Sequence, residues 1–471
     1  MNLPDLKSLR GKESPIYLQL YWRFRDAITA GKLAPGERVP SIRSLASELN
    51  LARGTVEAAY QMLTSEGYLI ARGPAGTEVS PQLEGGIGAT IPIGSTALHR
   101  PNPVKTSAFR PLQLGLPALD AFPRTTWVRI AGRNLRSMSV DDMVNADPNG
   151  YEPLRRAIAA YLAVSRGIAC TPDQVFVTAG YRGALELIRS TLLQPGDTGW
   201  FEDPGYLHAR RFLEGTGVRL APVPVDDDGL NVEAGLRRAA NAQFAVVTPT
   251  HQSPLGVPMS LPRRRALLEW SQAQRAWIIE DDYDSEFRYH GRPLPPLKSL
   301  DHGGRVLYAG TFSKVLYPGL HLAYLVVPEQ EIDRFRDTMA LLSSSPVLFQ
   351  ATVADFMDQG HFARHIKKMR SLYATRRNYL IQALAQVFGG ELRVPDRAGG
   401  IHVLAYLKSK YNDKALAAAA NSNGLAVRAL SEWCIRRRSP VGLLMGFANI
   451  ATPEEALDQV LRLQKIHKDL S

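Results

Sequence analysis

Cysteine is scarce in this sequence: Cys170 and Cys434 are the only two among 471 residues. So few thiols are typical of a reducing compartment, and we do not expect a disulfide between them. No run of about eighteen uncharged apolar residues occurs, so no membrane-spanning helix is expected. The first residues, MNLPDLKS, lack the basic-then-apolar order of a signal peptide, which favours a cytoplasmic location.

Metal-binding patterns are also missing. His361 and His365 stand four residues apart in HFARH and would share a helix face. The glutamate of the zinc-protease motif HExxH is absent, and no cysteine or acidic cluster completes a ligand set. We therefore predict a solvated helix face here and no metal site.

Acidic residues are outnumbered, since 56 Lys and Arg against 45 Asp and Glu give a formal net charge of +11. Such an excess permits binding to nucleic acid or another polyanion without proving it. The length favours two or more domains, and a hydrophobic content of 45% supports a sizeable buried core.

Residues 15–80 have the pattern of a small separate unit. Apolar residues recur every four positions on a first helix, and two shorter amphipathic helices follow. Ser41 is placed to cap the second helix, and Gly67 ends the third. Two short strands around RGPAG then predict a hairpin over residues 68–79. This is the element order of a winged helix-turn-helix, whose third helix enters the DNA major groove.

Five polar residues of this unit are candidate DNA contacts: Ser41, Arg43, Arg53, Thr55 and Arg72. The arginines supply charged donors to phosphates and base edges, and the two hydroxyls supply uncharged donors. The alternative is a three-helix protein-interaction module with ordinary surface arginines.

A resemblance strengthens the first interpretation. The segments PIYLQL, AGKLAPGERVPSIRSLA and RGTVEAAYQMLTSEGYL resemble the N-terminal domain of GntR-type bacterial transcription factors. It implies a GntR-type DNA-binding domain over residues 13–80. Ala52 departs from the family, which carries Ser or Thr there, so one phosphate-directed hydroxyl is lost. Residues 81–108, rich in Pro, Gly, Ser and Thr without periodicity, predict a flexible linker.

Residues 109–471 alternate between strand and helix patterns. The predicted strands are 174–178, 198–202, 244–248, 277–280, 306–309 and 323–327. Helical segments separate most of them, which predicts an α/β domain with a mainly parallel central sheet and ligands at the strand carboxyl ends. A small C-terminal αβ subdomain is expected from residue 392 onward.

Lys314 is the one charged residue in YAGTFSKVLYPGL, a run of apolar, hydroxyl and glycine residues. Desolvation lowers the pKa of such a lysine and frees a neutral amine for a Schiff base. Thr311 and Ser313 could donate to a phosphate beside it. For a lone lysine, snorkelling from a strand end would explain the pattern equally simply.

Other motifs at predicted strand ends favour a cofactor. TAGYR would place a phosphate at a helix N-terminus, EDPGY supplies an aromatic ring, and EDDYD supplies carboxylates and a phenol. An amine, an acid for a pyridine nitrogen, a stacking ring and phosphate donors are together what pyridoxal 5′-phosphate (PLP) requires.

The order of these motifs resembles the fold-type I aminotransferases, and the whole chain is similar to the MocR family of regulators. Its phrases DPNGYEPLRRAIAAYL, EDPGY, TPTHQSPLG, IEDDYDSEFRYHGRPLP and GTFSK carry the likeness. The resemblance implies that Lys314 forms the Schiff base, Asp281 pairs with the pyridine nitrogen, Tyr283 bonds the phenolic oxygen and Tyr206 stacks on the ring. Tyr181, Arg182, Thr311 and Ser313 would surround the phosphate.

The chain departs from the family pattern at several of these positions. Ser253 stands where aminotransferases carry Asn, His321 where an Arg clamps the phosphate, and Arg182 where Gln is usual. Compensation between the arginine lost and the arginine gained is our hypothesis. Leu444 replaces the arginine that holds the substrate carboxylate, and a leucine cannot do this. Arg428, at the effector-binding position of the family, is the candidate instead; an ordinary strand-end cation is the alternative.

These features predict a homodimeric, PLP-dependent transcriptional regulator that binds a double-stranded DNA operator and senses an amino compound, or PLP itself. We expect the aminotransferase-like domain to bind its ligand without efficient turnover. A working aminotransferase with a DNA-binding head is one alternative, and a scaffold that has lost PLP is another. The identity of the effector is not legible in the sequence.

Overall fold

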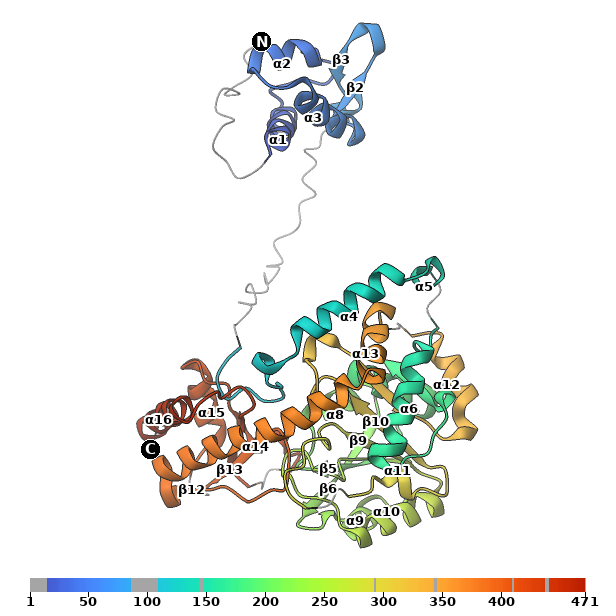
Figure 1. The fold of residues 1–471 in the computed structure, drawn as a ribbon, viewed down its shortest axis with the longest axis vertical. Helices are drawn as coiled ribbons and strands as arrows, with labels where there is room; N and C mark the ends of the chain where they lie inside the picture. Colours follow the sequence, from blue (N-terminus) through green and yellow to red (C-terminus); the bar gives the residue numbers. More distant parts are fainter. Residues whose placement is uncertain are drawn as a thin grey trace. The chain divides into compact units, whose positions relative to one another are not determined.

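The computed structural model describes residues 15–85, 109–144, 147–291, 294–342, 345–408, 411–436 and 440–470. The chain divides into two compact units, residues 1–106 and 107–471 (Figure 1), and each is treated by itself below. Of the linker predicted over 81–108, only the 3₁₀ turn Pro81–Gly85 lies within the described residues.

The smaller unit has the predicted order of elements. It contains α1 (Ile16–Thr29), β1 (Arg38–Val39), α2 (Ile42–Leu49), α3 (Arg53–Ser65), β2 (Leu69–Ala71) and β3 (Thr77–Val79). The stripe on α1 is buried through Leu20, Phe24 and Ile28. These side chains pack against α3, where Val56 and Leu63 have no exposed surface. The burial of this shared apolar face holds the three helices together.

The wing is a sheet of three strands in the order β1-β3-β2, all antiparallel. The hairpin β2–β3 is as predicted. Strand β1 was not predicted, because two residues show no measurable alternation. Arg38 and Val39 pair with Glu78 and Thr77, which ties the wing to the chain before α2.

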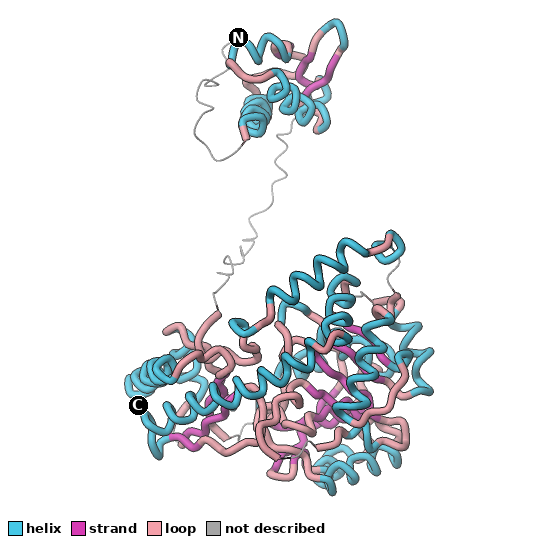
Figure 2. The backbone as a smooth tube through the Cα atoms, viewed as in Figure 1, coloured by secondary structure: helices cyan, strands magenta, loops and turns pink. Residues whose placement is uncertain are grey.

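The larger unit is built on a sheet of eight strands (Figure 2). The strands are β4 (Val175–Thr178), β5 (Thr198–Asp203), β6 (Arg219–Asp226), β7 (Gly229–Leu230), β8 (Phe244–Val247), β9 (Trp277–Asp282), β10 (Val306–Thr311) and β11 (Ala323–Val326). Their order is β4-β11-β10-β9-β8-β5-β6-β7. Strands β11 and β7 run antiparallel to their neighbours, so the sheet is mixed around a parallel centre.

Strand β6 was missed by the sequence analysis. It contains Pro222 and Pro224, which lack the backbone donor that a sheet needs and therefore argue against a strand. Both still pair with β5, opposite Phe201 and Asp203. Only the two-residue strand β7 lies beyond β6, so the position is close to the edge, where prolines are tolerated.

Helices cover both faces of this sheet (Figure 1). The helices of this part of the chain are α4 (Arg124–Ser137), α5 (Val140–Val144), α6 (Glu152–Arg166), α7 (Gly180–Leu192), α8 (Leu207–Glu214), α9 (Val232–Ala239), α10 (Leu261–Gln274), α11 (Leu297–Leu300), α12 (Ile332–Met339), α13 (Val347–Asp358) and α14 (His361–Phe388), of which α4 packs on α13. Residues alternate along β10: Leu307 packs with α7, α8 and α12, whereas Val306 packs with α9, α10 and α11. A sheet buried on both faces explains why its strands read as continuous apolar runs.

The C-terminal part forms a second, antiparallel sheet with helices, as predicted from residue 392 onward. Its strands are β12 (Leu392–Arg393), β13 (His402–Leu407), β14 (Arg428–Ala429) and β15 (Gly442–Gly446), in the order β12-β13-β15-β14. Helices α15 (Asp413–Ser422) and α16 (Pro453–Asp469) complete it. Helix α14 packs along α16 and contributes with it to the core shared with the large sheet.

No disulfide joins Cys170 and Cys434, both of which lie within the described residues. Among the helices in the described ranges, none is both long and apolar enough to cross a membrane.

Candidate functional site

The predicted strand-end motifs come together at the carboxyl ends of β9 and β10. These neighbouring strands are parallel, and Asp281 pairs in register with Ala309. Lys314 follows β10 by three residues, so its loop starts beside Asp281. Parallel strands bring their carboxyl ends to one edge, where a ligand can be held.

The Lys314 amine lies in a narrow, half-buried position. Its Nζ donates a hydrogen bond of 3.0 Å to the carbonyl oxygen of Gly115. Loss of water around the amine lowers the pKa of Lys314, and the nearby carboxylates of Asp284 and Asp281 partly oppose this. Gly115 has φ +76°, a conformation that favours glycine, and a Cβ there would lie 2.6 Å from Nζ and displace the lysine amine. Sequence reasoning missed Gly115 because it is far from Lys314 along the chain.

Asp281 is a buried carboxylate, and burial raises its pKa to about 8. The nearby Tyr181 hydroxyl lowers the pKa of Asp281 more than any other neighbour does, and so partly offsets this rise. By hydrogen-bond geometry, that hydroxyl oxygen is buried and has no partner among the described atoms. Burial of an acid beside an unpartnered donor costs free energy, and a polar, cationic ligand group would offset that cost. The residues therefore fit a pyridine ring whose nitrogen carries a proton.

The Tyr181 hydroxyl is among the neighbours of Asp281. The expected place of Tyr181 around the phosphate stays a prediction.

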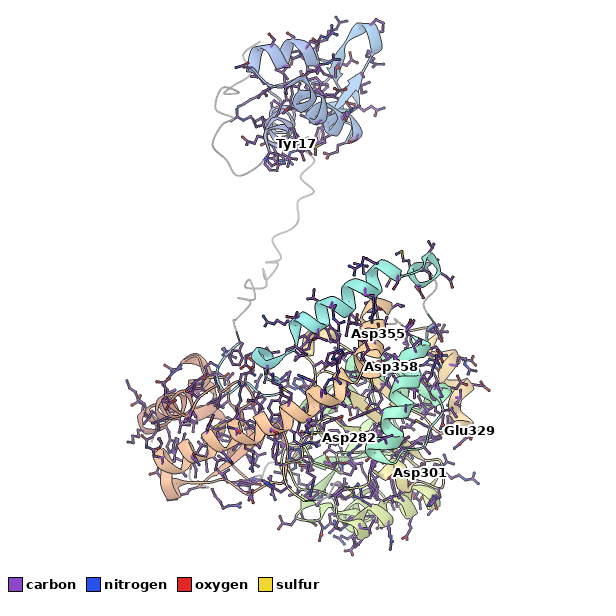
Figure 3. The ribbon with its side chains drawn as sticks, viewed as in Figure 1. Tyr17, Asp282, Asp301, Glu329, Asp355 and Asp358 are labelled. Carbon is purple, nitrogen blue, oxygen red and sulfur yellow. The ribbon has the colours of Figure 1, made fainter. Side chains whose placement is uncertain are left out.

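Asp282, the next residue, lies within the larger unit (Figure 3), and its carboxylate has two hydrogen-bond donors. Its Oδ2 accepts hydrogen bonds of 2.5 Å from both Arg166 Nη2 and the Tyr308 hydroxyl. All three residues are buried. Asp282 is thus already paired, which leaves Asp281 as the carboxylate free to receive a ligand. The Arg166 contact could not be predicted from the sequence, because Arg166 is the last residue of α6 and lies 116 residues from Asp282 along the chain.

Tyr283 lies just beyond β9, and its hydroxyl oxygen is 3.0 Å from His251 Nδ1. The same nitrogen is 3.0 Å from Asp284 Oδ2. Tyr283 was predicted to belong to the site, whereas His251 and Asp284 were not. Tyr206, at the N-cap of α8, has its ring centroid 6.1 Å from that of Tyr181 and 5.8 Å from that of Trp433.

The expected phosphate residues are spread over two loops. Thr311 ends β10, and its Oγ1 accepts a hydrogen bond of 3.2 Å from the Ser313 N–H. Gly180 starts α7 at φ +71°, and a Cβ there would lie 4.0 Å from the His321 carbonyl carbon. The two loops therefore meet at a helix N-terminus, which favours an anion.

Arg182 is exposed, and its guanidinium carbon lies 5.5 Å from the centre of the Phe212 ring. The hypothesis that it compensates for His321 stays a prediction.

Arg428 is exposed on β14 and pairs in register with Leu444 on β15. Leu444 itself has no exposed surface and packs with Leu207, Leu255 and other apolar residues from both parts of the unit. Partial burial and the positive charges of Arg211, Arg428 and Lys314 lower the pKa of His208.

In the smaller unit, Arg43, Arg53 and Arg72 are all exposed, and Thr55 lies in the first turn of α3. Arg72 Nε donates to Glu78 Oε1 at 2.8 Å across the wing. Ser41 accepts from the Ser44 N–H at 3.2 Å, so its hydroxyl caps α2 as predicted.

The predicted solvated face of His361 and His365 is wrong for the second residue. His365 is buried, with Nε2 2.9 Å from the Val315 carbonyl oxygen, because α14 packs against the Lys314 loop. Across the described ranges, no group of three or more His, Cys, Asp and Glu side chains has the arrangement of a metal site.

Comparison with known proteins agrees with both halves of this description. Residues 16–79 match the family model of bacterial regulatory proteins of the gntR family, and residues 126–439 match that of class I and II aminotransferases. The chain is 35% identical over 456 residues to the "Probable rhizopine catabolism regulatory protein MocR" of Rhizobium meliloti. That alignment covers 94% of this chain and 92% of the relative. The chain belongs to the MocR family of GntR-type transcriptional regulators.

Other relatives of the MocR type extend the comparison. The pyridoxine biosynthesis transcriptional regulator PdxR of Corynebacterium glutamicum is 34% identical over 451 residues, with 95% of each chain covered. Among solved structures, a kynurenine aminotransferase of Pyrococcus horikoshii matches with a TM-score of 0.70 at 26% identity. It covers 78% of this chain and 92% of its own. The larger unit of this MocR-family chain therefore has the fold of the PLP-dependent class I and II aminotransferases.

Proposed function

We propose that this regulator binds PLP through Lys314 and uses the occupied site to sense an amino compound. The observation that carries the proposal is the meeting of a desolvated lysine amine with a buried, unpaired carboxylate at the ends of β10 and β9. When bound, PLP supplies an aldehyde that the lysine amine captures and that a second amine can displace.

Each residue has a separate task in this proposal. The Asp281 carboxylate would hold a proton at the ring nitrogen, because a cation beside it offsets its burial. Tyr206 would cover one face of the ring, and Tyr283 would donate to the phenolic oxygen. Thr311 and Ser313, with the N-terminus of α7, would bind the phosphate.

Efficient transamination is not expected at this site. In the family pattern an arginine at the Leu444 position holds the substrate carboxylate, and here that position is fully buried and apolar. Without this anchor a substrate is not held in the orientation that catalysis requires. Arg428 would instead bind an acidic group of the effector, which makes the bound state a signal rather than a reaction step.

A homodimer and a DNA operator complete the proposed function. GntR-type winged helices bind DNA operators, and exposed arginines on α2, α3 and the wing support this role. Val128, Leu135, Val140, Met143 and Val144 are all more than half exposed on α4 and α5. Such an apolar face on one pair of helices supports pairing with a second copy.

The test compares the wild-type chain with Lys314→Ala after both are mixed with PLP. The visible absorbance band of lysine-bound PLP should appear in the wild type and be missing from the variant. Operator binding should respond to the effector only when this band is present, since a ligand shifts an equilibrium only through differential affinity. A variant with an unchanged band would rule out Lys314 as the attachment site.

A working aminotransferase is the second candidate, because the larger unit resembles active enzymes such as the kynurenine aminotransferase. Single-turnover assays with a panel of amino donors distinguish the two. Conversion of PLP to its amine form at rates typical of enzymes, about 1 per second or faster, would favour this alternative.

A further inference from the structure

The His251 ring is closely packed between two turns of the chain. It follows β8 by four residues, and its ring packs against Gly256 and Gly400. A Cβ at Gly400 would lie 2.2 Å from His251 Cε1, and one at Gly256 would lie 2.9 Å from Nε2. Heavy atoms do not approach so closely, and both glycines have positive φ. The ring can occupy this position only because neither residue has a side chain.

One nitrogen of this ring faces two oxygen atoms. His251 Nδ1 is 3.0 Å from Asp284 Oδ2 and 3.0 Å from the Tyr283 hydroxyl oxygen. Without a proton, Nδ1 would direct its lone pair at a buried carboxylate, which is repulsive. Nδ1 therefore carries a proton and donates it toward both oxygens. The tautomer is fixed by Asp284, whose side chain is almost completely buried.

This arrangement determines where the Tyr283 proton can go. The Tyr283 oxygen already accepts from Nδ1, so its own hydrogen cannot point at His251. Asp284 Oδ2 accepts from the same N–H. Ser253 also hydrogen-bonds the Tyr283 oxygen and lowers the pKa of Tyr283, as a donor to that oxygen does, so it too leaves the Tyr283 hydrogen free. Asp281 influences both Tyr283 and the Lys314 amine electrostatically, and the hydrogen is directed to the side of the site where these two residues lie.

We propose that His251, held by Asp284, is a positioning residue that fixes the Tyr283 hydroxyl as a donor toward the cofactor's phenolic oxygen. This inference rests on the PLP binding proposed above. A hydrogen bond donated to the phenolic oxygen favours its negatively charged form. The pKa of the bound cofactor is therefore lower than it would be without this donor.

The other titratable groups facing Tyr283 do not replace His251 in this role. Asp281 and Glu202 are carboxylates whose pKa values burial raises to about 8 and about 7. His402 is nearby, with ring centroids 5.7 Å apart, but its Nε2 lies 3.0 Å from the Pro254 carbonyl oxygen. Burial lowers the pKa of His402 to about 4, so it is neutral at physiological pH.

The experiment follows the visible band of the PLP-bound chain as a function of pH. Tyr283→Phe should raise the midpoint by about one pH unit, a tenfold change in the protonation equilibrium. His251→Ala should raise it equally, and the double variant should show no further rise. In His251→Asn the side-chain amide can replace the Nδ1 donor, so the midpoint should return most of the way to the wild-type value. His402→Ala is the matched control and should leave the midpoint unchanged.

Two outcomes overturn the proposal: an unchanged midpoint in His251→Ala, or a shift that persists in the Tyr283→Phe background. A purely structural role for the ring would give the second result. If His251→Ala does not fold, the comparison of His251→Asn with His251→Gln takes its place, because only the first keeps a donor at Nδ1.

A measurement on the PLP-free chain separates this inference from PLP binding. A downfield imidazole proton resonance should be present in the wild type, be lost in His251→Asn and move in Asp284→Asn. Its absence from the wild type would refute the hydrogen bond itself. If the resonance is present but PLP gives no band, the proposed function fails, and the role toward the cofactor fails with it.

Discussion

Arg428 on β14 stands directly opposite Leu444 on β15 in the antiparallel sheet of the C-terminal part. Cross-strand partners project to the same side of a sheet, with Cβ atoms about 4.5–5.5 Å apart. The lost carboxylate anchor at Leu444 and the candidate effector arginine are therefore neighbours. Leu444 has no exposed surface, whereas Arg428 is exposed to solvent.

The first prediction concerns Arg428. Arg428→Ala should leave the PLP band intact but weaken effector binding at least tenfold, because a charge-assisted hydrogen bond is worth about 1.5–3 kcal/mol. Spectral titration of the PLP-bound chain with the effector measures this. Arg393→Ala is the control, since Arg393 lies on β12 of the same sheet and packs over Tyr406. Equal loss in both variants would show that Arg428 has no specific role.

The second prediction concerns Leu444 as part of an apolar cluster. Leu444→Ala should lower the free energy of unfolding by about 2–5 kcal/mol, because it opens a cavity between Leu207, Leu255 and Leu404. Chemical denaturation measures the change. Leu461→Ala, at a position 48% exposed, should change stability by less than about 1 kcal/mol. A small effect at Leu444 would mean that the cluster collapses to fill the space.

The third prediction concerns the buried acid Asp281. Burial raises the pKa of Asp281 to about 8 in the folded chain, against about 3.9 when unfolded. The folded state therefore keeps a proton that the unfolded state releases, and the free energy of unfolding falls as pH rises from about 4 to about 8. In Asp281→Asn the PLP-free chain should lose less stability over this range.

Denaturation of the PLP-free chain at a series of pH values tests this prediction. Burial also raises to about 7 the pKa values of Glu202, Glu280 and Glu286. These three residues also make the free energy of unfolding fall as pH rises, and Asp281→Asn retains their contribution. Asp458→Asn, at an exposed site on α16, is the control. Identical slopes in wild type and Asp281→Asn would contradict the assignment.

The fourth prediction concerns DNA. Arg53→Ala and Arg72→Ala should each weaken operator binding and reduce the slope of log affinity against log salt by about 1, if each contacts a phosphate. Binding isotherms at several salt concentrations give the slope. Arg25→Ala in α1, where Arg25 pairs with Asp26, should leave it unchanged. A slope unaltered in Arg53→Ala would remove this residue from the interface.

The sequence determined features that depend on neighbours in the chain. The apolar stripes of residues 15–80 and the strands ending near Asp281 and Lys314 were predictable, because helix and strand periodicity is local. The family motifs carried the likeness to MocR regulators. Strands β1 and β6 were not predicted. Strand β1 has only two residues, and β6 contains Pro222 and Pro224, which lack the backbone N–H that a central strand uses.

Only the tertiary structure decided which groups share the pocket. Gly115 meets Lys314 across 199 residues of sequence, Arg166 neutralises Asp282, and His251 meets Asp284. These contacts determine which carboxylate is paired with an arginine, which groups surround Tyr283 and how the lysine amine is hydrogen-bonded. Burial and hydrogen-bond geometry depend on every packed element at once, so no local pattern encodes them.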